Sequence, residues 1–297
     1  MAIRLQLAGH RKDLGGGFEV SRLLPAASHR SVGPFVFFDH FGPAVERVGV
    51  NHDVRPHPHI GLATVTYLFE GAMMHRDSLG SVQLIEPGAI NWMTAGRGIV
   101  HSERRPEHLQ EREYTNHGLQ LWTALPRDHE EDEPSFLHTP ATAIPELERG
   151  GARIRVLVGD AFGAHSPVPT LSHTLYLDVN LSAGATLDLS LLAPELAVYP
   201  VRGDLALAGQ TIDQGRMAVL EPQALRLHSE GGAHFVLIGG EPLDCPRHMW
   251  WNFVSSRRER ILQASEDWSA QRMGQIPGEH EYIPLPPTPL KPSEPMS

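Results

Sequence analysis

Short apolar segments separated by glycine and proline turns make up most of the chain. Residues 60–71 form a run rich in β-branched and aromatic side chains that ends at Glu-Gly, which predicts a strand closed by a tight turn. Residues 74–88 are predicted to form a strand and a turn, after which residues 89–101 return toward the first strand. Further strands are predicted at residues 174–180, 196–203, 216–220 and 234–238. Between these predicted strands, no long run of apolar residues has the spacing of a helix. The pattern favours an all-β protein built as a sandwich or barrel of the jelly-roll kind.

Length and composition indicate two domains. At about 150 residues per domain, a chain of 297 residues with 41% hydrophobic content is long enough for two packed cores. The acidic stretch at residues 128–134 is charged and ends in proline, so we interpret it as a solvated linker. We therefore expect a first domain over residues 1–126, a linker over 127–136, a second domain over 137–245, and a C-terminal part over 246–297.

The C-terminal part shows a different pattern. Ser256 and Glu259 have the spacing of a capping box, which predicts a short helix with Ile261, Leu262 and Trp268 on its buried side. Beyond this helix the chain is rich in proline, which is typical of an extended tail.

Two short stretches carry the candidate chemistry. Side chains alternate along a strand, so His57 and His59 share one face, and so do His101 and Glu103. If the two strands meet, three imidazoles and one carboxylate face a single point. These ligand types suit a divalent first-row metal such as Fe, Mn, Ni, Co, Cu or Zn rather than Ca. Four protein ligands around a six-coordinate ion would leave two open positions, as a catalytic metal requires.

The second half of the chain retains only part of this pattern. When it is laid on the first half, Leu189 and Leu191 occupy the positions of the first histidine pair, and His228 and Glu230 align with the second pair. Two ligands alone bind a metal poorly. We therefore expect one metal per chain, held by the first half.

Several longer motifs resemble the pirin family of the cupin superfamily, over about residues 18 to 245. These motifs lie at residues 34–39, 57–71, 92–103, 117–122 and 235–242. The resemblance implies an all-β protein of two consecutive cupin (jelly-roll β-barrel) domains, here followed by the short C-terminal helix and the Pro-rich tail. It also implies a metal, usually iron, in the N-terminal barrel, bound at His57, His59, His101 and Glu103. Residues 137–245 would then form the C-terminal cupin domain without a complete metal site.

The sequence departs from the wider cupin pattern at one position. Ordinary cupins place a glutamate ligand about four residues after the second histidine, and this chain has Ala63 there. Glu103 must then supply the carboxylate.

The same resemblance implies a reaction, the cleavage of flavonols such as quercetin by O2 with release of carbon monoxide. Its cofactor would be one divalent metal, expected to be Fe(II), with Mn, Ni, Co, Cu or Zn as alternatives. Glu103 beside the open positions is the candidate base for the hydroxyl proton of the substrate. We therefore expect an enzyme. The alternatives are a non-enzymatic metal- or redox-sensing regulator that acts through a protein partner, and a cupin enzyme for another substrate.

Charge and cysteine content indicate which binding partners and which cellular compartment to expect. A net charge of −10 argues against direct nucleic-acid binding. The single cysteine, the lack of a signal peptide and the lack of a long apolar run favour the cytoplasm and no membrane association. Polar residues that could orient the ligand imidazoles are also present, and among them His75 is favoured because it follows the Glu-Gly turn on the returning strand.

Overall fold

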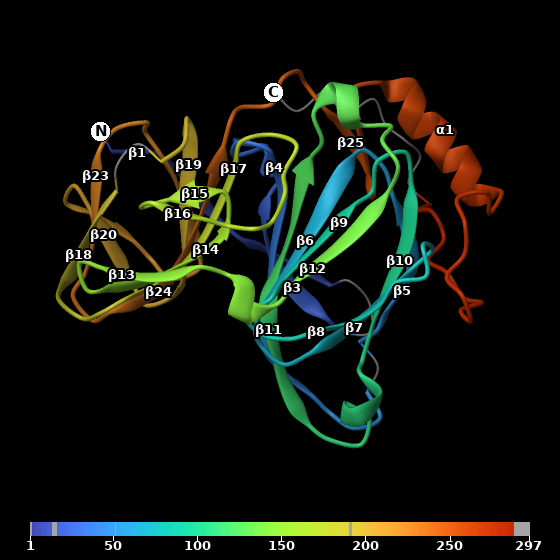
Figure 1. Cartoon of the computed structure of the whole chain (residues 1–297), viewed down its shortest axis with the longest axis horizontal. Helices are drawn as coiled ribbons and strands as arrows, with labels where there is room; N and C mark the ends of the chain where they lie inside the picture. Colours follow the sequence, from blue (N-terminus) through green and yellow to red (C-terminus); the bar gives the residue numbers. More distant parts are fainter. Residues whose placement is uncertain (1, 14–16, 51, 190–191, 288–297) are drawn as a thin grey trace. The chain divides into compact units, whose positions relative to one another are not determined.

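The computed structural model describes residues 2–13, 17–50, 52–189 and 192–287. Within these residues strands predominate, with a single α-helix, α1 (Arg258–Ser269), and three 3-10 turns at Glu107–Leu109, Arg127–His129 and Ala141–Ala143. The chain forms two compact units (Figure 1). Unit 1 contains residues 1–10, 22–36 and 139–242, and unit 2 contains residues 11–21, 37–138 and 243–297.

Unit 1 is built from a seven-stranded and a four-stranded sheet. The larger sheet has the order β1 (Ile3–Ala8), β22 (Arg216–Leu220), β19 (Glu195–Arg202), β24 (Ala233–Gly240), β17 (Thr174–Leu181), β14 (Ala152–Val158) and β13 (Glu146–Arg149). The smaller has the order β18 (Ala185–Leu189), β23 (Leu225–Ser229), β20 (Leu205–Leu207) and β21 (Gln210–Ile212). Unit 1 also contains a separate two-stranded ribbon of β15 (Asp160–Ala161) and β16 (Ala164–His165). The strands predicted in this half are confirmed.

The alternation of apolar side chains explains why these sheets close on a core. Leu177 on β17 and Phe235 on β24 are fully buried, as are Leu187 on β18 and Leu227 on β23, and all four belong to one hydrophobic cluster. Because successive side chains point to opposite faces, each strand directs every second residue inward.

Unit 2 repeats this arrangement and contains the two candidate ligand strands. Its larger sheet has the order β12 (Ser135–Thr139), β9 (Ile90–Thr94), β6 (Leu62–Glu70), β11 (Tyr114–Ala124), β4 (Phe35–Glu46), β3 (Glu19–Leu24) and β2 (His10–Asp13). Its smaller sheet has the order β5 (Val54–His59), β10 (Ile99–Arg104), β7 (Met73–Asp77) and β8 (Val82–Ile85) (Figure 1). A short ribbon of β25 (His248–Trp250) and β26 (Phe253–Ser255) precedes α1.

The compact units are interleaved along the chain. The N-terminal strand β1 pairs with β22, so it belongs to the same sheet as the second half of the sequence. Conversely, the segment from residue 243 onward belongs to unit 2 together with residues 37–138. The predicted domains, residues 1–126 and 137–245, are each continuous in sequence, whereas each compact unit combines several separate segments. The predicted bounds stay a prediction.

The acidic stretch is less solvated than expected. It begins in the 3-10 turn Arg127–His129, but Glu130 is only 3% exposed. Its carboxylate lies 2.8 Å from Nε of the fully buried Arg247 and accepts hydrogen bonds from Ser255 and Ser256. The prediction of a solvated run is thus wrong for Glu130, because a distant arginine compensates its buried charge.

The predicted C-terminal helix is confirmed as α1, but its details differ. Ile261 and Trp268 are buried as expected, whereas Leu262 is 44% exposed. No side-chain cap closes the first turn, so the expected capping box is wrong. Ser256, its predicted capping residue, donates instead to Glu130.

The expected tail lies beyond α1. Residues 279–286 contain neither helix nor strand, and residues 288–297 lie outside the described residues. In the described part of the chain, no helix combines the length and apolarity needed to cross a membrane.

Candidate metal centre

Strands β5 and β10 bring the candidate ligands together. They pair antiparallel with His101 directly opposite His57. Two residues further along β10, Glu103 pairs with Val54, so β5 contains one extra residue in this interval. The extra residue falls at Arg55 and Pro56, and Pro56 has no N–H to donate to a ladder. In this irregular interval the carbonyl oxygen of Arg55 lies within hydrogen-bond distance of the ring of His57.

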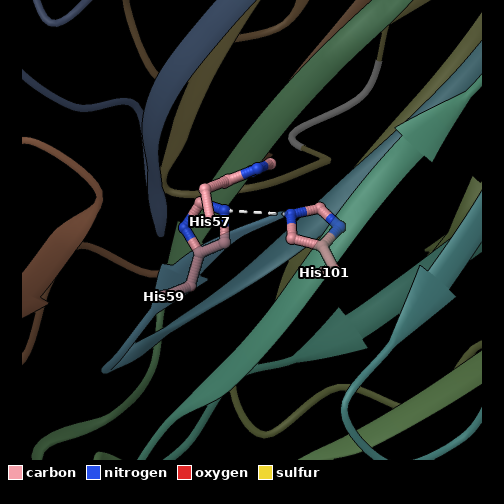
Figure 2. Close-up of side chains that lie close together, drawn as sticks. All are labelled: His57, His59 and His101. Atoms are coloured by element: carbon pink, nitrogen blue, oxygen red, sulfur yellow. Dashed lines mark hydrogen bonds between the residues drawn. The ribbon is translucent and has the colours of Figure 1, made fainter. Parts of the chain in front are cut away.

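Three imidazoles converge on one point (Figure 2). His57, His59 and His101 offer ligand nitrogens that all lie within 4.8 Å of one another. Ring centroids are 4.3 Å apart for His57 and His101 and 5.0 Å apart for the other two pairs. The exposed fractions of the three residues are 6%, 1% and 2%. The prediction that these three histidines meet is confirmed, and the cluster could bind one metal ion.

Backbone carbonyls orient two of the rings for metal binding. The Nδ1 atom of His57 lies 2.8 Å from the carbonyl oxygen of Arg55, and Nδ1 of His59 lies 3.2 Å from that of Asn252. A carbonyl only accepts, so each Nδ1 must carry the proton and each Nε2 presents its lone pair to the site. The carbonyl of Asn252 has no signature in the sequence, because any residue supplies one.

The spacing of the nitrogens fits a shared ion. Nε2 of His59 lies 3.1 Å from Nε2 of His101. Two nitrogens bound at about 2.1 Å to one ion lie roughly 3 Å apart when they are at right angles. The observed separation is therefore one that a single ion can bridge.

The electrostatics keep the imidazoles neutral. Burial lowers the pKa of His57 to about 4, and the hydrogen bond to Arg55 only partly opposes this effect. Burial, together with the charges of the neighbouring histidines, also lowers the pKa values of His59 and His101 well below the ordinary value. Neutral imidazole is the form that binds a metal. The site is thus ready for an ion at pH 7 without losing protons from histidine.

Glu103 lies beside this cluster without joining it. Its Oε1 is 3.6 Å from Nδ1 of His101, beyond hydrogen-bond distance, and it is not among the residues whose ligand atoms converge. Both His101 Nδ1 and Glu103 Oε2 are buried without a hydrogen-bond partner among the described atoms. Burial raises the pKa of Glu103 to about 8, against the opposing charge of Arg104. A buried carboxyl with an unpartnered oxygen is the kind of group that a nearby cation would compensate.

The histidine favoured as an orienting residue has a different partner. His75 lies opposite Glu103 in the pairing of β7 with β10, but its Nε2 contacts Oδ2 of Asp77 at 3.0 Å. The ring also stacks on Phe136 at a centroid distance of 4.2 Å. His75 therefore packs against the site, with its ring centroid 5.4 Å from that of His101, and does not orient a ligand ring through that nitrogen.

The second half of the chain does not repeat the cluster. His228 contacts the hydroxyl of Thr186 at 3.1 Å, and its Nε2 lies 3.4 Å from the exposed Glu230. Leu189 is buried, whereas Leu191 lies outside the described residues. Among the residues that the structure describes, the histidine cluster in unit 2 is the one group with metal-ligand geometry.

Aromatic side chains and a small cavity lie next to the cluster. Trp122 packs edge-on against His59 at 5.1 Å and stacks on Phe37 at 3.9 Å. Glu103 lines a cavity of about 30 Å³, together with Glu46, His52 and Met73. Pockets for drug-sized ligands are about ten times larger. This cavity admits water or O2 but no flavonol unless side chains move.

The fold and the cluster together define a two-domain cupin with a candidate metal site in one barrel. Residues 17–123 match the Pirin family, and residues 176–274 match the Pirin C-terminal cupin domain. A pirin-like protein of Caulobacter vibrioides is 47% identical over 96% of this chain and 99% of its own length. Human pirin is 33% identical over 92% of this chain and 93% of its own. The chain belongs to the pirin family.

A solved structure supports the same assignment. The crystal structure of a quercetin 2,3-dioxygenase from Acinetobacter baumannii aligns with a TM-score of 0.91 at 34% sequence identity. The alignment covers 99% of this chain and 98% of that chain. The expected fold of two cupin domains is thereby confirmed.

Proposed function

We propose that the protein is a metal-dependent dioxygenase that cleaves flavonols with O2, with one ion bound by His57, His59, His101 and Glu103. The observation that carries this proposal is the convergence of three buried, neutral imidazoles next to an unpartnered carboxyl. The likeness to a protein named quercetin 2,3-dioxygenase supports the choice of reaction. The substrate would be a small aromatic flavonol and the co-substrate O2.

The ion is proposed to be Fe(II). Three imidazole nitrogens and one carboxylate oxygen suit non-haem iron, and they bind Mn, Ni, Co, Cu or Zn as well. Such an ion acidifies a bound hydroxyl and offers open positions for substrate. The single cysteine of the chain, Cys245, is free, which agrees with a reducing cytoplasm as the setting.

The chain's own residues have separate tasks. The carbonyls of Arg55 and Asn252 hold two rings in the ligating tautomer. Glu103 is assigned two roles, as the anionic ligand and as the base for the 3-hydroxyl proton of the flavonol. Its Oε2 has no competing hydrogen bond in the described part of the chain, so it is free to accept that proton. Trp122 closes the apolar side of the site and excludes water there.

The test is flavonol turnover by protein reconstituted anaerobically with Fe(II), Mn(II), Co(II) or Ni(II). O2 uptake and carbon monoxide release are followed for the wild type and for Glu103→Ala. Turnover with carbon monoxide in the wild type alone would support a dioxygenase that uses this site. A metal-loaded wild type without turnover, or an equally active variant, would overturn it.

One observation favours a second function. All four candidate ligands are at least nine-tenths buried, and the cavity at Glu103 is small. A closed site of this kind suits a metal- or redox-sensing regulator that acts on a protein partner. Metal-dependent binding of a partner by protein without turnover would support that function, and flavonol cleavage at the rate of an ordinary enzyme would argue against it.

A further inference from the structure

The C-terminal segment at residues 276–283, here called the C-terminal strap, is anchored at both of its ends in unit 2. Ile276 is 3% exposed and packs in one hydrophobic cluster with Ile60 and Trp268. At the other end, the N–H of Ile283 donates to the carbonyl of Pro56 at 2.8 Å. The carbonyl of Ile283 accepts from Nε1 of Trp268 at 2.9 Å. The strap is therefore bonded to β5 at the residue directly before His57.

Between these anchors, Glu279 binds the second ligand strand, β10. Ser102 donates through Oγ to Oε1 of Glu279 at 2.8 Å, and Arg104 donates through Nε to Oε2 at 3.1 Å. A second guanidinium nitrogen of Arg104 also bonds to Oε2. The side chains of Glu279 and Arg104 are only 7% and 15% exposed. Charge-assisted hydrogen bonds between largely buried groups are stronger than those between exposed pairs.

Strand alternation determines on which face of β10 the contact with Glu279 lies. Ser102 and Arg104 lie on the face of β10 opposite to His101 and Glu103. Glu279 therefore holds β10 from behind the metal site. The strap also borders a cavity of about 450 Å³ together with Arg76 and Arg104. On that side its attachment therefore depends on the contacts of the buried Glu279 and the half-exposed Glu281 with Arg104, and not on continuous packing.

Charge keeps the contact in place. Burial would raise the pKa of Glu279, but the hydrogen bonds from Arg104 and Ser102 and the positive charge of Arg104 lower it below the ordinary value. The carboxylate is thus ionised throughout the neutral range.

We propose that Glu279 is a positioning residue for the metal site: by fixing Ser102 and Arg104 it holds β10 against β5 and so slows release of the ion. This inference rests on the metal site of the proposed function. Groups behind the ligands commonly change metal affinity by roughly 10- to 100-fold. None of the sequence patterns marks Glu279, because its partners lie about 175 residues away.

The test compares Glu279→Gln with Glu281→Gln. Glu281 is a matched control because it lies on the same strap and contacts the same Arg104 at 2.8 Å, but is 52% exposed. Co(II) release into excess chelator, the visible absorption of bound Co(II), and thermal unfolding of the metal-free protein are measured for each. We expect release to quicken roughly tenfold in Glu279→Gln, with an altered spectrum. Glu281→Gln should release Co(II) within twofold of the wild-type rate.

Release and spectra that match the wild type in Glu279→Gln would overturn the proposal, as would equal effects of the two substitutions. If Glu279→Gln does not fold, Ser102→Ala removes one hydrogen bond without a charge, and unchanged Co(II) release in that variant overturns the proposal as well. A wild type that fails to bind Co(II) at all would instead overturn the proposed metal site itself.

Discussion

Binding of a divalent metal at pH 7 should release about one proton, and Glu103→Gln should abolish that release. The pKa of Glu103 is raised to about 8 by burial, so the carboxyl is protonated in most metal-free molecules at pH 7. The imidazoles contribute little, since burial lowers the pKa of His57 to about 4 and those of His59 and His101 well below the ordinary value. A ligand must be deprotonated before it binds a metal.

The magnitude follows from the pKa of Glu103. One pH unit below its pKa, a carboxyl is about nine-tenths protonated, so we expect about 0.9 proton per Mn(II) at pH 7. At pH 9 the expected release falls to about 0.1, because Glu103 is then already ionised. Isothermal titration calorimetry in two buffers with different ionisation enthalpies measures this number directly.

The glutamine variant is the control for other sources of protons. It keeps an oxygen ligand but has no proton to lose, whereas a water ligand would lose its proton in both proteins. Equal proton release by the wild type and Glu103→Gln at pH 7 would refute the reasoning. Release by the wild type that does not fall between pH 7 and pH 9 would refute it as well.

Three further predictions concern stability and access. Metal-free protein should be most stable to urea near pH 6.5. Below that pH the lowered pKa values of His57, His59 and His101 each remove stability, about 3 kcal/mol for His57 between pH 6.5 and 4, because the unfolded imidazoles bind protons that the buried ones do not. The raised pKa of Glu103 lowers stability as pH rises from 4.5 to 8, so it offsets one of the three histidines below pH 6.5 and destabilises the protein above it. A profile that does not fall on both sides of pH 6.5 would contradict these shifts. Glu130→Ala should destabilise unit 2 by about 3 kcal/mol in urea unfolding, because it leaves the buried Arg247 with only the half-exposed carboxylate of Asp244. Glu131→Ala, which removes a half-exposed carboxylate from Arg257 and Arg260, should cost less than about 1 kcal/mol. Met73→Ala should enlarge the cavity at Glu103 and raise kcat/KM for a flavonol several-fold, whereas an unchanged value at full metal loading would show that substrate enters elsewhere.

The meeting of the three histidines could be predicted because it depends on strand alternation alone. His57 and His59 need only an extended backbone to share a face, and β5 and β10 provide it. The strands of the second barrel could be predicted as well, since β17 and β22 are short segments rich in apolar side chains.

Features that depend on distant partners could not be predicted. Glu130 lies in a charged run, and its partners far along the chain, Arg247, Ser255 and Ser256, explain its burial. The pairing of β1 with β22 places the N-terminal strand at the edge of a sheet otherwise built from residues 146–240, and no local pattern indicates this. The orientation of His59 depends on the carbonyl of Asn252, and that of β10 on Glu279. In each case the local residues permit several arrangements, and tertiary contacts select one.

The central claim, a single metal held by His57, His59, His101 and Glu103, is tested most directly by metal content. Protein reconstituted with Fe(II) under anaerobic conditions is desalted and analysed for iron in the wild type, Glu103→Ala and His228→Ala. The account predicts one iron per chain in the wild type and in His228→Ala, and none in Glu103→Ala. Two irons per wild-type chain, or full occupancy in Glu103→Ala, would contradict it.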